Sequence, residues 1–382
     1  MKKIYWRPKR VSRIELVLVA LLALGGYLLV EFWRDVVPAP YYKEKLEAAQ
    51  LTKRAMLALK GERQRRKIPV QLDSDPANSG MVGYLVSSMT STAGHLPAKQ
   101  TSVNPNFAAV IVGWLREVGV NAGDRVAVGV SGSFPVLNLS AYAALQVLRA
   151  KPVIITSASG SQWGANIPGW LWIHQEQYLY DRRIFSFRSI AASRGGIGDR
   201  AYGMEPDAIK RMDAEVTRLG LRLLEPRTFT DSIEMRMQVF EEKAGGKPYK
   251  AYINVGGGTA SVGTSLGKKL FRPGLNKRPP RGALAVDSVM SRFAKSGVPV
   301  IHLVEVDEMA KMLGLPLSPK TTPEVGQGKV YISREYRKWV AGVLLLVIFG
   351  VLFAFIRLDW GFRILHTGKK RGQEAERPEQ MV

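Results

Sequence analysis

Two long apolar segments, one near each end of the chain, restrict most strongly how this sequence can fold. They cover residues 14–33 and 339–356, and neither contains a lysine or an arginine. Each is long enough to cross a hydrocarbon core of roughly 30 Å as a helix. We therefore expect two transmembrane helices, with the large region between them on one side of the membrane.

Basic residues indicate the orientation of these spans. Residues 1–13 are rich in lysine and arginine and contain no acid, and residues 357–382 are also basic. The positive-inside rule places both segments in the cytoplasm, although residues just before the second span are basic too. A two-pass protein with both termini cytoplasmic and an extracytoplasmic main domain is expected. Two rival interpretations stay open: residues 14–33 as a cleaved signal peptide, and residues 339–356 as a buried helix of a soluble domain.

The pattern divides the chain into segments of different character. These are a basic tail (1–13), a first span (14–33), a juxtamembrane amphipathic helix (34–70), an extracytoplasmic α/β domain (71–314), a linker rich in proline, glycine and threonine (315–338), a second span (339–356) and a second tail (357–382).

Short apolar runs alternate with helical patterns in the middle region. Strands are expected at 125–130, 152–157, 249–255 and 298–304, with weaker ones near 187 and 221. Helices are expected at 135–149, 168–180, 206–219, 231–243 and 282–295. This alternation is typical of an open, mainly parallel α/β sheet with flanking helices.

Small and hydroxyl-bearing residues follow three of the expected strands, in the turns 131–133, 157–161 and 256–261. The carboxyl ends of parallel strands lie along one edge of a sheet, where backbone N–H and side-chain O–H groups can bind an anion. The alternative is that these are ordinary tight turns at helix starts. The candidate binding residues are Ser131, Gly132, Ser133, Ser157, Ser159, Gly256, Gly257, Gly258, Thr259 and Ser261.

The turn after the first strand also suggests a catalytic serine. Ser131 lies in a GxSxS sequence, close to the GxSxG turn between strand and helix that presents a nucleophile. A hydrolase of this kind needs a histidine, and His302 follows Ser131 in the expected order, with Asp231 or Asp287 between them as orienting groups. Ser131 and His302 are therefore candidate catalytic residues.

Composition makes several other functions less favourable. The chain contains no cysteine, which excludes disulfides and thiolate sites. Its four histidines lack metal-binding spacing, and its glycine-rich turns do not match the usual phosphate-binding motifs, so we expect neither a metal nor a cofactor. The net charge of +23 favours a polyanionic partner, and an extracytoplasmic domain is expected to meet surface polymers or lipid rather than nucleic acid. The excess charge also has a plainer interpretation, solubility.

Several stretches together resemble a known family. They are Asp75-Pro76 followed by Gly80, residues 98–107 (AKQTSVNPNF), residues 129–135 (GVSGSFP) and residues 253–259 (INVGGGT). In combination they look like the poly-gamma-glutamate system protein family. The resemblance implies a bacterial membrane protein that works with the other proteins that synthesise and export poly-gamma-glutamate, and it assigns no catalytic residues.

Three functions remain open at this point. The first is an accessory protein that assists synthesis, export or retention of the polymer by binding it or its assembly. The second is a serine-dependent amidase or transferase that trims or attaches the polymer. The third is an unrelated sensor that associates with another surface polymer or with peptidoglycan.

Overall fold

The computed structural model describes residues 13–263 and 265–358, which form two units. One unit covers residues 38–332 and holds the large sheet. The other combines residues 13–37 with residues 333–358. Most of the expected basic tail 1–13 and of the expected tail 357–382 lies outside the described residues.

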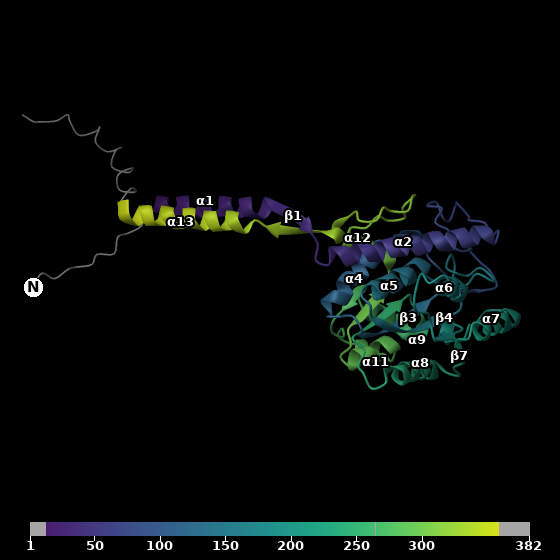
Figure 1. Ribbon diagram of the computed structural model, residues 1–382. Helices are drawn as coiled ribbons and strands as arrows, with labels where there is room; N and C mark the ends of the chain where they lie inside the picture. The colour runs from purple at the N-terminus through teal and green to yellow at the C-terminus, as the bar shows by residue number, and fades with distance from the viewer. Residues whose placement is uncertain (1–12, 264, 359–382) are drawn as a thin grey trace, which may run out of the picture. The chain divides into compact units, whose positions relative to one another are not determined.

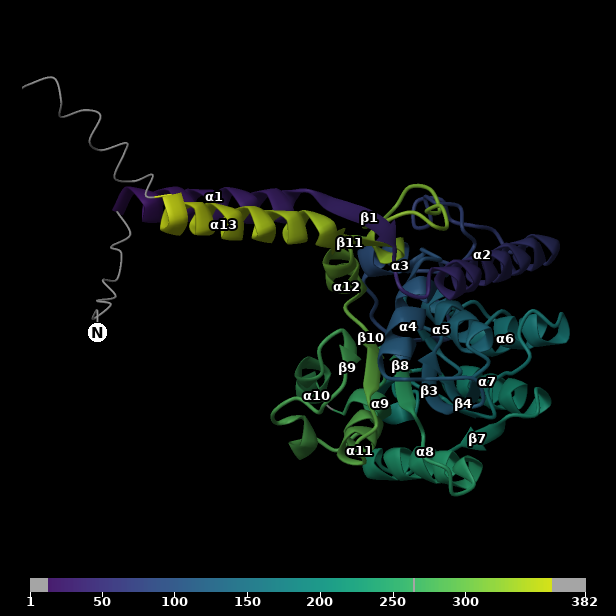
Figure 2. The ribbon, with the colours of Figure 1, turned by 60° about the vertical axis from the view of Figure 1, so that its left-hand side comes forward.

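A seven-stranded sheet organises the larger unit (Figures 1 and 2). Its order is β7-β6-β4-β3-β8-β10-β9, and every neighbouring pair is parallel except β10 and β9. The strands are β3 (Arg125–Ser131), β4 (Lys151–Ser157), β6 (Ala191–Ser193), β7 (Arg222–Leu224), β8 (Ala251–Val255), β9 (Gly274–Asn276) and β10 (Val300–Leu303). The expected mainly parallel α/β fold is confirmed.

The strand order reverses at β3, which starts the series β4, β6, β7 on one side and has β8 and then β10 on the other. At such a switch point the connections leave in opposite directions, and a crevice opens at the carboxyl ends of the two central strands. The residues that follow β3 and β8 therefore border this crevice.

Both faces of the sheet are buried. Successive side chains of a strand point to opposite faces and pack into two separate cores. Val128 and Ile253, which are paired in register, belong to the first core, whereas Ala127 and Tyr252 belong to the second. Near-continuous apolar strands are typical of a parallel sheet covered on both sides.

Helices cover the first core in two layers. They are α2 (Tyr42–Arg65), α4 (Phe107–Glu117), α5 (Pro135–Val147) and α6 (Trp172–Asp181). The juxtamembrane helix expected from the sequence corresponds to α2, and it packs on α4 and α5 through Ala48, Ala55 and Leu59, which are fully buried. This helix therefore contributes to the main core of the larger unit.

The remaining helices pack against different parts of the core. They are α3 (Leu96–Ser102), α7 (Pro206–Arg218), α8 (Phe229–Ala244), α9 (Thr259–Val262), α10 (Ser265–Leu270), α11 (Val289–Lys295) and α12 (Val306–Leu313), with 3-10 turns at Ile197–Asp199, Ala283–Ala285 and Lys329–Tyr331. Strands β2 (Thr90–Thr92) and β5 (Gly160–Ser161) form a separate parallel pair.

Three expected helix starts are wrong. The helix expected over 168–180 begins at Trp172. The other two have a visible cause. The helix expected over 282–295 begins at Val289, because the Ser288 side chain caps it by accepting from the Ser291 N–H. The helix expected from residue 231 begins at Phe229, where the Thr228 side chain accepts from the Asp231 N–H. In both cases a hydroxyl side chain satisfies a backbone donor at the first turn, which defines the start of a helix.

The smaller unit consists of two antiparallel helices from opposite ends of the chain and a short strand pair. We refer to these two helices as the helical hairpin. Helices α1 (Arg13–Phe32) and α13 (Lys338–Leu358) run side by side, and β1 (Arg34–Pro38) pairs with β11 (Ile332–Tyr336) (Figures 1 and 2). Both helices are long and apolar enough to span a membrane. Sequence interpretation treated 315–338 as a linker and did not anticipate β11.

Specific contacts join the two helices of this hairpin. A Cβ atom added at Gly26 would overlap the Leu344 side chain, so the small residue lets the helices approach. At the hairpin's end, the Trp33 and Trp339 rings meet edge to face with centroids 6.1 Å apart. Arg337 pairs with Asp35 at 2.6 Å. The hairpin thus has its own packing and its own ion pair.

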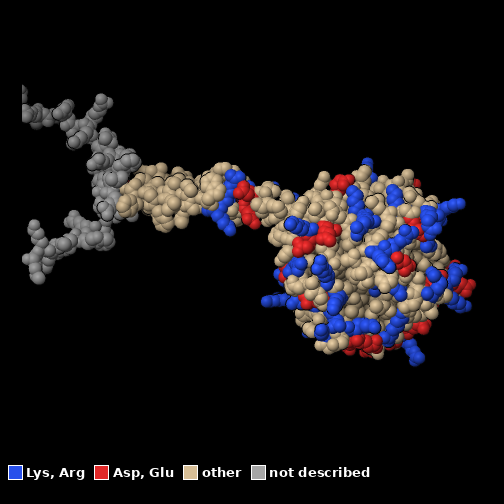
Figure 3. Space-filling model, viewed as in Figure 1, with Lys and Arg blue, Asp and Glu red and all other residues tan. Residues whose placement is uncertain are grey.

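Positive charge is spread over the face of the larger unit that Figure 3 shows. Figure 3 shows lysine and arginine side chains spread over the viewed face, with acidic side chains between them. Such a distribution gives a general attraction for anions rather than one concentrated patch.

Candidate functional site

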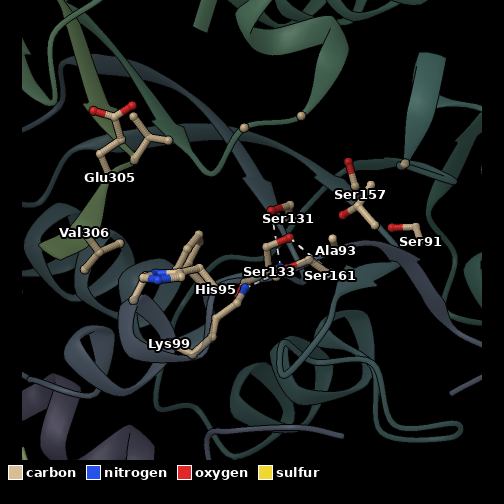
Figure 4. A pocket seen from close by; sticks show the side chains of 18 of the residues that line it. Ser91, Ala93, His95, Lys99, Ser131, Ser133, Ser157, Ser161, Glu305 and Val306 are labelled. Carbon is tan, nitrogen blue, oxygen red and sulfur yellow. Dashed lines mark hydrogen bonds between the residues drawn. The ribbon is translucent and has the colours of Figure 1, made fainter. Parts of the chain in front are cut away.

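A cavity of about 850 Å³ lies at the carboxyl ends of the central strands. The turns after β3 and β4, the loops after β8 and β10, helix α3 and the segment before α3 all contribute to its lining. This is the switch point of the sheet, where α/β proteins commonly bind ligands. Figure 4 shows how the polar side chains gather there.

Most of the sequence-predicted binding residues meet in this cavity. Those that line it are Ser131, Ser133, Ser157, Ser159, Gly257, Gly258 and Thr259. The other three do not line it: Gly132 packs against the backbone of residues 159–160, Gly256 lies beside Ser131, and Ser261 lies near Tyr252. The common sheet edge brings the three turns together, as parallel pairing requires.

Hydrogen bonds connect the three turns to one another. Ser131 Oγ accepts from the Ser133 N–H at 3.3 Å and donates to the carbonyl of Val255 at 3.4 Å, which links β3 to β8. Ser133 Oγ accepts from the Ser161 N–H at 3.3 Å, which links β3 to the turn after β4. The hydroxyl-rich wall is therefore held by several strands.

Gly256 is required by the position of Ser131. Its φ is +92°, a backbone conformation that residues other than glycine rarely adopt. A Cβ atom there would lie 2.8 Å from Ser131 Oγ. The glycine therefore allows the backbone of the loop after β8 to approach the serine turn closely.

Lys99 is a cavity residue that was not among the binding residues predicted from the sequence. It projects from α3 and is only 3% exposed, and its Nζ donates to Ser161 Oγ at 2.7 Å and to the Ser133 carbonyl (Figure 4). The ammonium also lies 4.0 Å from the centroid of the Phe134 ring. Within residues 13–263 and 265–358, no aspartate or glutamate forms an ion pair with it.

Burial changes the protonation of Lys99. Loss of water around the ammonium lowers the pKa of Lys99 to about 7. The serine hydroxyl and the carbonyl replace part of the lost hydration, but they carry no full negative charge. Near neutral pH the side chain can therefore exist as either an ammonium or an amine.

The sequence carries only part of the signal for Lys99. The run LPAKQTS has a proline at the first turn of the helix and a single lysine among small and polar residues. The burial of Ala98, Thr101 and Ser102 around this lysine is visible only in the structure.

Charged residues of both signs line the other side of the cavity. They are His95, Glu305, Asp307, Glu308 and Lys311. His95 Nδ1 lies 3.4 Å from Asp307 Oδ2, and Glu305 adopts a left-handed conformation with φ of 49° just after β10. The cavity thus has a donor-rich wall around Lys99 and a mixed wall formed by residues near α12.

The structure does not bring the expected catalytic triad together. His302 is fully buried in β10, outside the cavity lining, and its Nδ1 lies 3.0 Å from Asn254 Nδ2. Asn254 is in β8, between His302 and the strand that ends in Ser131. Asp231 accepts from the Arg227 N–H, and Asp287 pairs with Arg292.

The remaining expectations concern metals and other histidines. Among the described residues, no group of three or more histidine, aspartate or glutamate side chains is placed to hold a metal ion. His174 pairs with Glu215 at 3.0 Å, and His366 lies outside the described residues.

Comparisons of the chain with protein-family models, with curated proteins and with solved structures give no match.

Proposed function

We propose that this protein is a membrane-anchored accessory protein that assists synthesis, export or retention of poly-gamma-glutamate, and that its cavity binds carboxylates of the polymer. The observation that carries the proposal is Lys99, a buried cation whose hydrogen-bond partners are a serine hydroxyl and a carbonyl rather than a carboxylate. A ligand carboxylate at this position completes an ion pair that the protein itself leaves open.

Electrostatics favours such a ligand. Removing an ammonium from water costs free energy, and a charge-assisted hydrogen bond to a carboxylate recovers part of it. The second carboxylate oxygen can accept from serine hydroxyls or from backbone N–H groups at the exposed Gly257 and Gly258, which line the same cavity. Because the negative charge favours the ammonium, binding is expected to raise the pKa of Lys99.

The polymer also fits the charge of the whole protein. Poly-gamma-glutamate carries one carboxylate per repeating unit, whereas this chain has a net charge of +23. Dispersed lysine and arginine side chains attract a long polyanion without selecting a particular segment (Figure 3). The cavity then provides the specific contacts.

The two apolar helices support the proposed membrane arrangement. We infer that both termini are cytoplasmic and that the α/β unit faces away from the cytoplasm of a bacterial cell. The resemblance of residues 98–107, 129–135 and 253–259 to the poly-gamma-glutamate system family supports a role beside the synthesis and export proteins. In this role the protein contacts both the membrane and the growing polymer.

Deletion of the protein in a cell that produces poly-gamma-glutamate tests this function. We expect less polymer, and expect it to be restored by the wild-type chain but not by Lys99→Met at the same membrane level. The exposed Lys247→Met variant is the matched control, because it removes one positive charge outside the cavity.

The amount and the chain length of the polymer are measured together. Loss of polymer supports the accessory role, and longer or unattached polymer supports processing. Unchanged amount, length and attachment would contradict both roles and would favour a sensor of another surface polymer.

A further inference from the structure

The hydrogen bond between Lys99 and the Ser161 hydroxyl also places a nucleophile next to a base. The two atoms Lys99 Nζ and Ser161 Oγ lie 2.7 Å apart, and both residues line the cavity. Ser161 ends the short strand β5 and is only 6% exposed. A nucleophile beside a nitrogen base in a cavity is the arrangement that activates a serine for acyl transfer.

We propose that Ser161 and Lys99 form a serine–lysine catalytic pair that cleaves or transfers an amide-linked chain bound in the cavity. This inference rests on the proposed function for its substrate class, a gamma-glutamyl amide, but the pair is defined by its own geometry. It replaces Ser131 and His302, which the structure does not bring together, with two residues in direct contact.

The surroundings of Lys99 direct its nitrogen toward Ser161. One N–H of Lys99 is donated to the Ser133 carbonyl, and the Phe134 ring lies 4.0 Å away on another side. In the neutral amine, the remaining lone pair is then available to accept the Ser161 hydroxyl proton. The Ser133 carbonyl thus positions the base.

Ser131 has a different environment. Its hydroxyl donates to the Val255 carbonyl at 3.4 Å, and its oxygen accepts from the Ser133 N–H. A carbonyl oxygen can hold the proton of Ser131 but does not remove it at neutral pH. The geometry therefore favours Ser161 as the nucleophile.

The base is available near neutral pH because burial lowers the pKa of Lys99 to about 7. Several titratable groups also face the cavity. From the segment before α3 comes His95; from the end of β10 and from α12 come Glu305, Asp307, Glu308 and Lys311.

The reaction balances with an amide and water or an amine as reactants. Ser161 Oγ attacks the amide carbonyl carbon while its proton passes to Lys99 Nζ. The C–N bond then breaks, and the leaving amine takes that proton. Water or an acceptor amine next attacks the acyl ester and gives its proton to Lys99, which returns it to Ser161 Oγ as the ester C–O bond breaks. Backbone N–H groups at Gly257 and Gly258 can stabilise the carbonyl oxygen when it becomes negative.

The two protonation states of Lys99 have different roles, one in binding and one in the reaction. Below about pH 7 the ammonium holds a carboxylate, and above it the amine acts as a base. Binding and reaction at this residue should therefore change with pH in opposite directions.

A fluorophosphonate probe tests the pair directly on the full-length protein in detergent micelles. Ser161 Oγ attacks phosphorus, the P–F bond breaks, and fluoride leaves as the proton passes to Lys99. We expect the label on the peptide that contains Ser161, at a rate that increases with pH through about 7 and then levels off. Ser161→Ala and Lys99→Met should each lower labelling at least tenfold, and Ser296→Ala, an exposed control outside the cavity, should not change it.

Binding of a gamma-glutamyl oligomer is measured on the same samples. Labelling of Ser131 in place of Ser161, or absence of label from a folded protein that still binds the oligomer, would overturn the catalytic pair and leave the proposed function standing. Full labelling in Lys99→Met would also overturn it. Labelling at Ser161 without oligomer binding would instead contradict the proposed function and support a nucleophile for another amide.

Discussion

Lys99 Nζ lies 2.7 Å from Ser161 Oγ, although the two residues are 62 positions apart in the sequence. Lys99 comes from α3, and Ser161 comes from β5, which pairs with β2 just before that helix. The β2–β5 pair therefore holds a cation against the hydroxyl-rich turn after β4. This contact is the centre of both the proposed binding site and the proposed chemistry.

The stability of the larger unit should depend on pH through Lys99. Its pKa is lowered to about 7 in the folded protein, below the ordinary value of 10.5, so the unfolded chain binds more protons between these pH values. The free energy of unfolding should therefore increase as pH rises through this window, by at most roughly 1.4 kcal/mol per pH unit. Lys99→Met should remove this contribution.

Urea titrations of both proteins from about pH 6.5 to about pH 9.5 measure the effect. Other titrating groups contribute equally to the two proteins and cancel in the difference. Identical pH slopes for the wild type and the variant would contradict a deprotonating Lys99.

Any side chain at position 256 should lower the stability of the folded protein. Gly256→Ala places a Cβ atom 2.8 Å from Ser131 Oγ and forces alanine to adopt a φ of +92°. We expect a loss of about 1–3 kcal/mol in the free energy of unfolding. Gly258→Ala is the matched control, because nothing lies within 4 Å of the added atom and φ is −57°. Equal stability of the two variants would show that the close approach of this loop to Ser131 is unimportant.

A buried ion pair supports the loop that follows β6. Asp199 and Arg236 are 5% and 4% exposed, lie 2.8 Å apart, and share hydrogen bonds with Ser193 and Ser232. Asp199→Asn leaves the buried guanidinium without its counterion and should cost about 3–5 kcal/mol of stability.

The comparison for this variant is Glu242→Gln. Glu242 pairs with Arg222 at 2.7 Å, but both side chains are more than 40% exposed. Its loss should cost less than about 1 kcal/mol. Thermal unfolding of the two variants gives the difference, and similar midpoints would contradict a structural role for Asp199.

Packing of the helical hairpin should depend on Gly26. Gly26→Ile brings a branched side chain into the space of Leu344, whereas Gly25 has nothing within 4 Å of an added Cβ atom and Gly25→Ile is the control. Because the chain contains no cysteine, the W33C/W339C pair can be joined selectively by a short bismaleimide. We expect less cross-linking with Gly26→Ile than with Gly25→Ile.

Leu344→Ala provides a test of rescue. It shortens the side chain that meets residue 26, so it should restore cross-linking to Gly26→Ile. If the two isoleucine variants cross-link equally, the contact between Gly26 and Leu344 does not determine how the helices pack.

The central sheet could be predicted because its main strands are visible in the sequence itself. β3, β4, β8 and β10 are four to seven residues long and almost entirely buried, so they appear as apolar runs. β2, β5, β9 and β11 have two to five residues each and exist through pairing with distant segments. No local period marks such strands, which explains why they were missed.

The candidate site was predictable only in part for the same reason. The serine and glycine turns follow visible strands, so a shared sheet edge brings them together. Lys99 comes instead from a seven-residue helix that the sequence analysis did not predict. His302 was paired with Ser131 from their order in the chain, but strand order places β8 and Asn254 between their strands.

Binding of a defined gamma-glutamyl oligomer by the full-length protein in detergent micelles tests the central claim most directly. Affinity is measured at about pH 6.5 and about pH 8.5 for the wild type, Lys99→Met and the control Lys247→Met. A charge-assisted hydrogen bond contributes about 1.5–3 kcal/mol, so Lys99→Met should bind roughly 10- to 100-fold more weakly at the lower pH. The wild type should weaken toward the higher pH, and Lys247→Met should follow it. Equal affinity of Lys99→Met and the wild type at the lower pH would contradict carboxylate binding at Lys99.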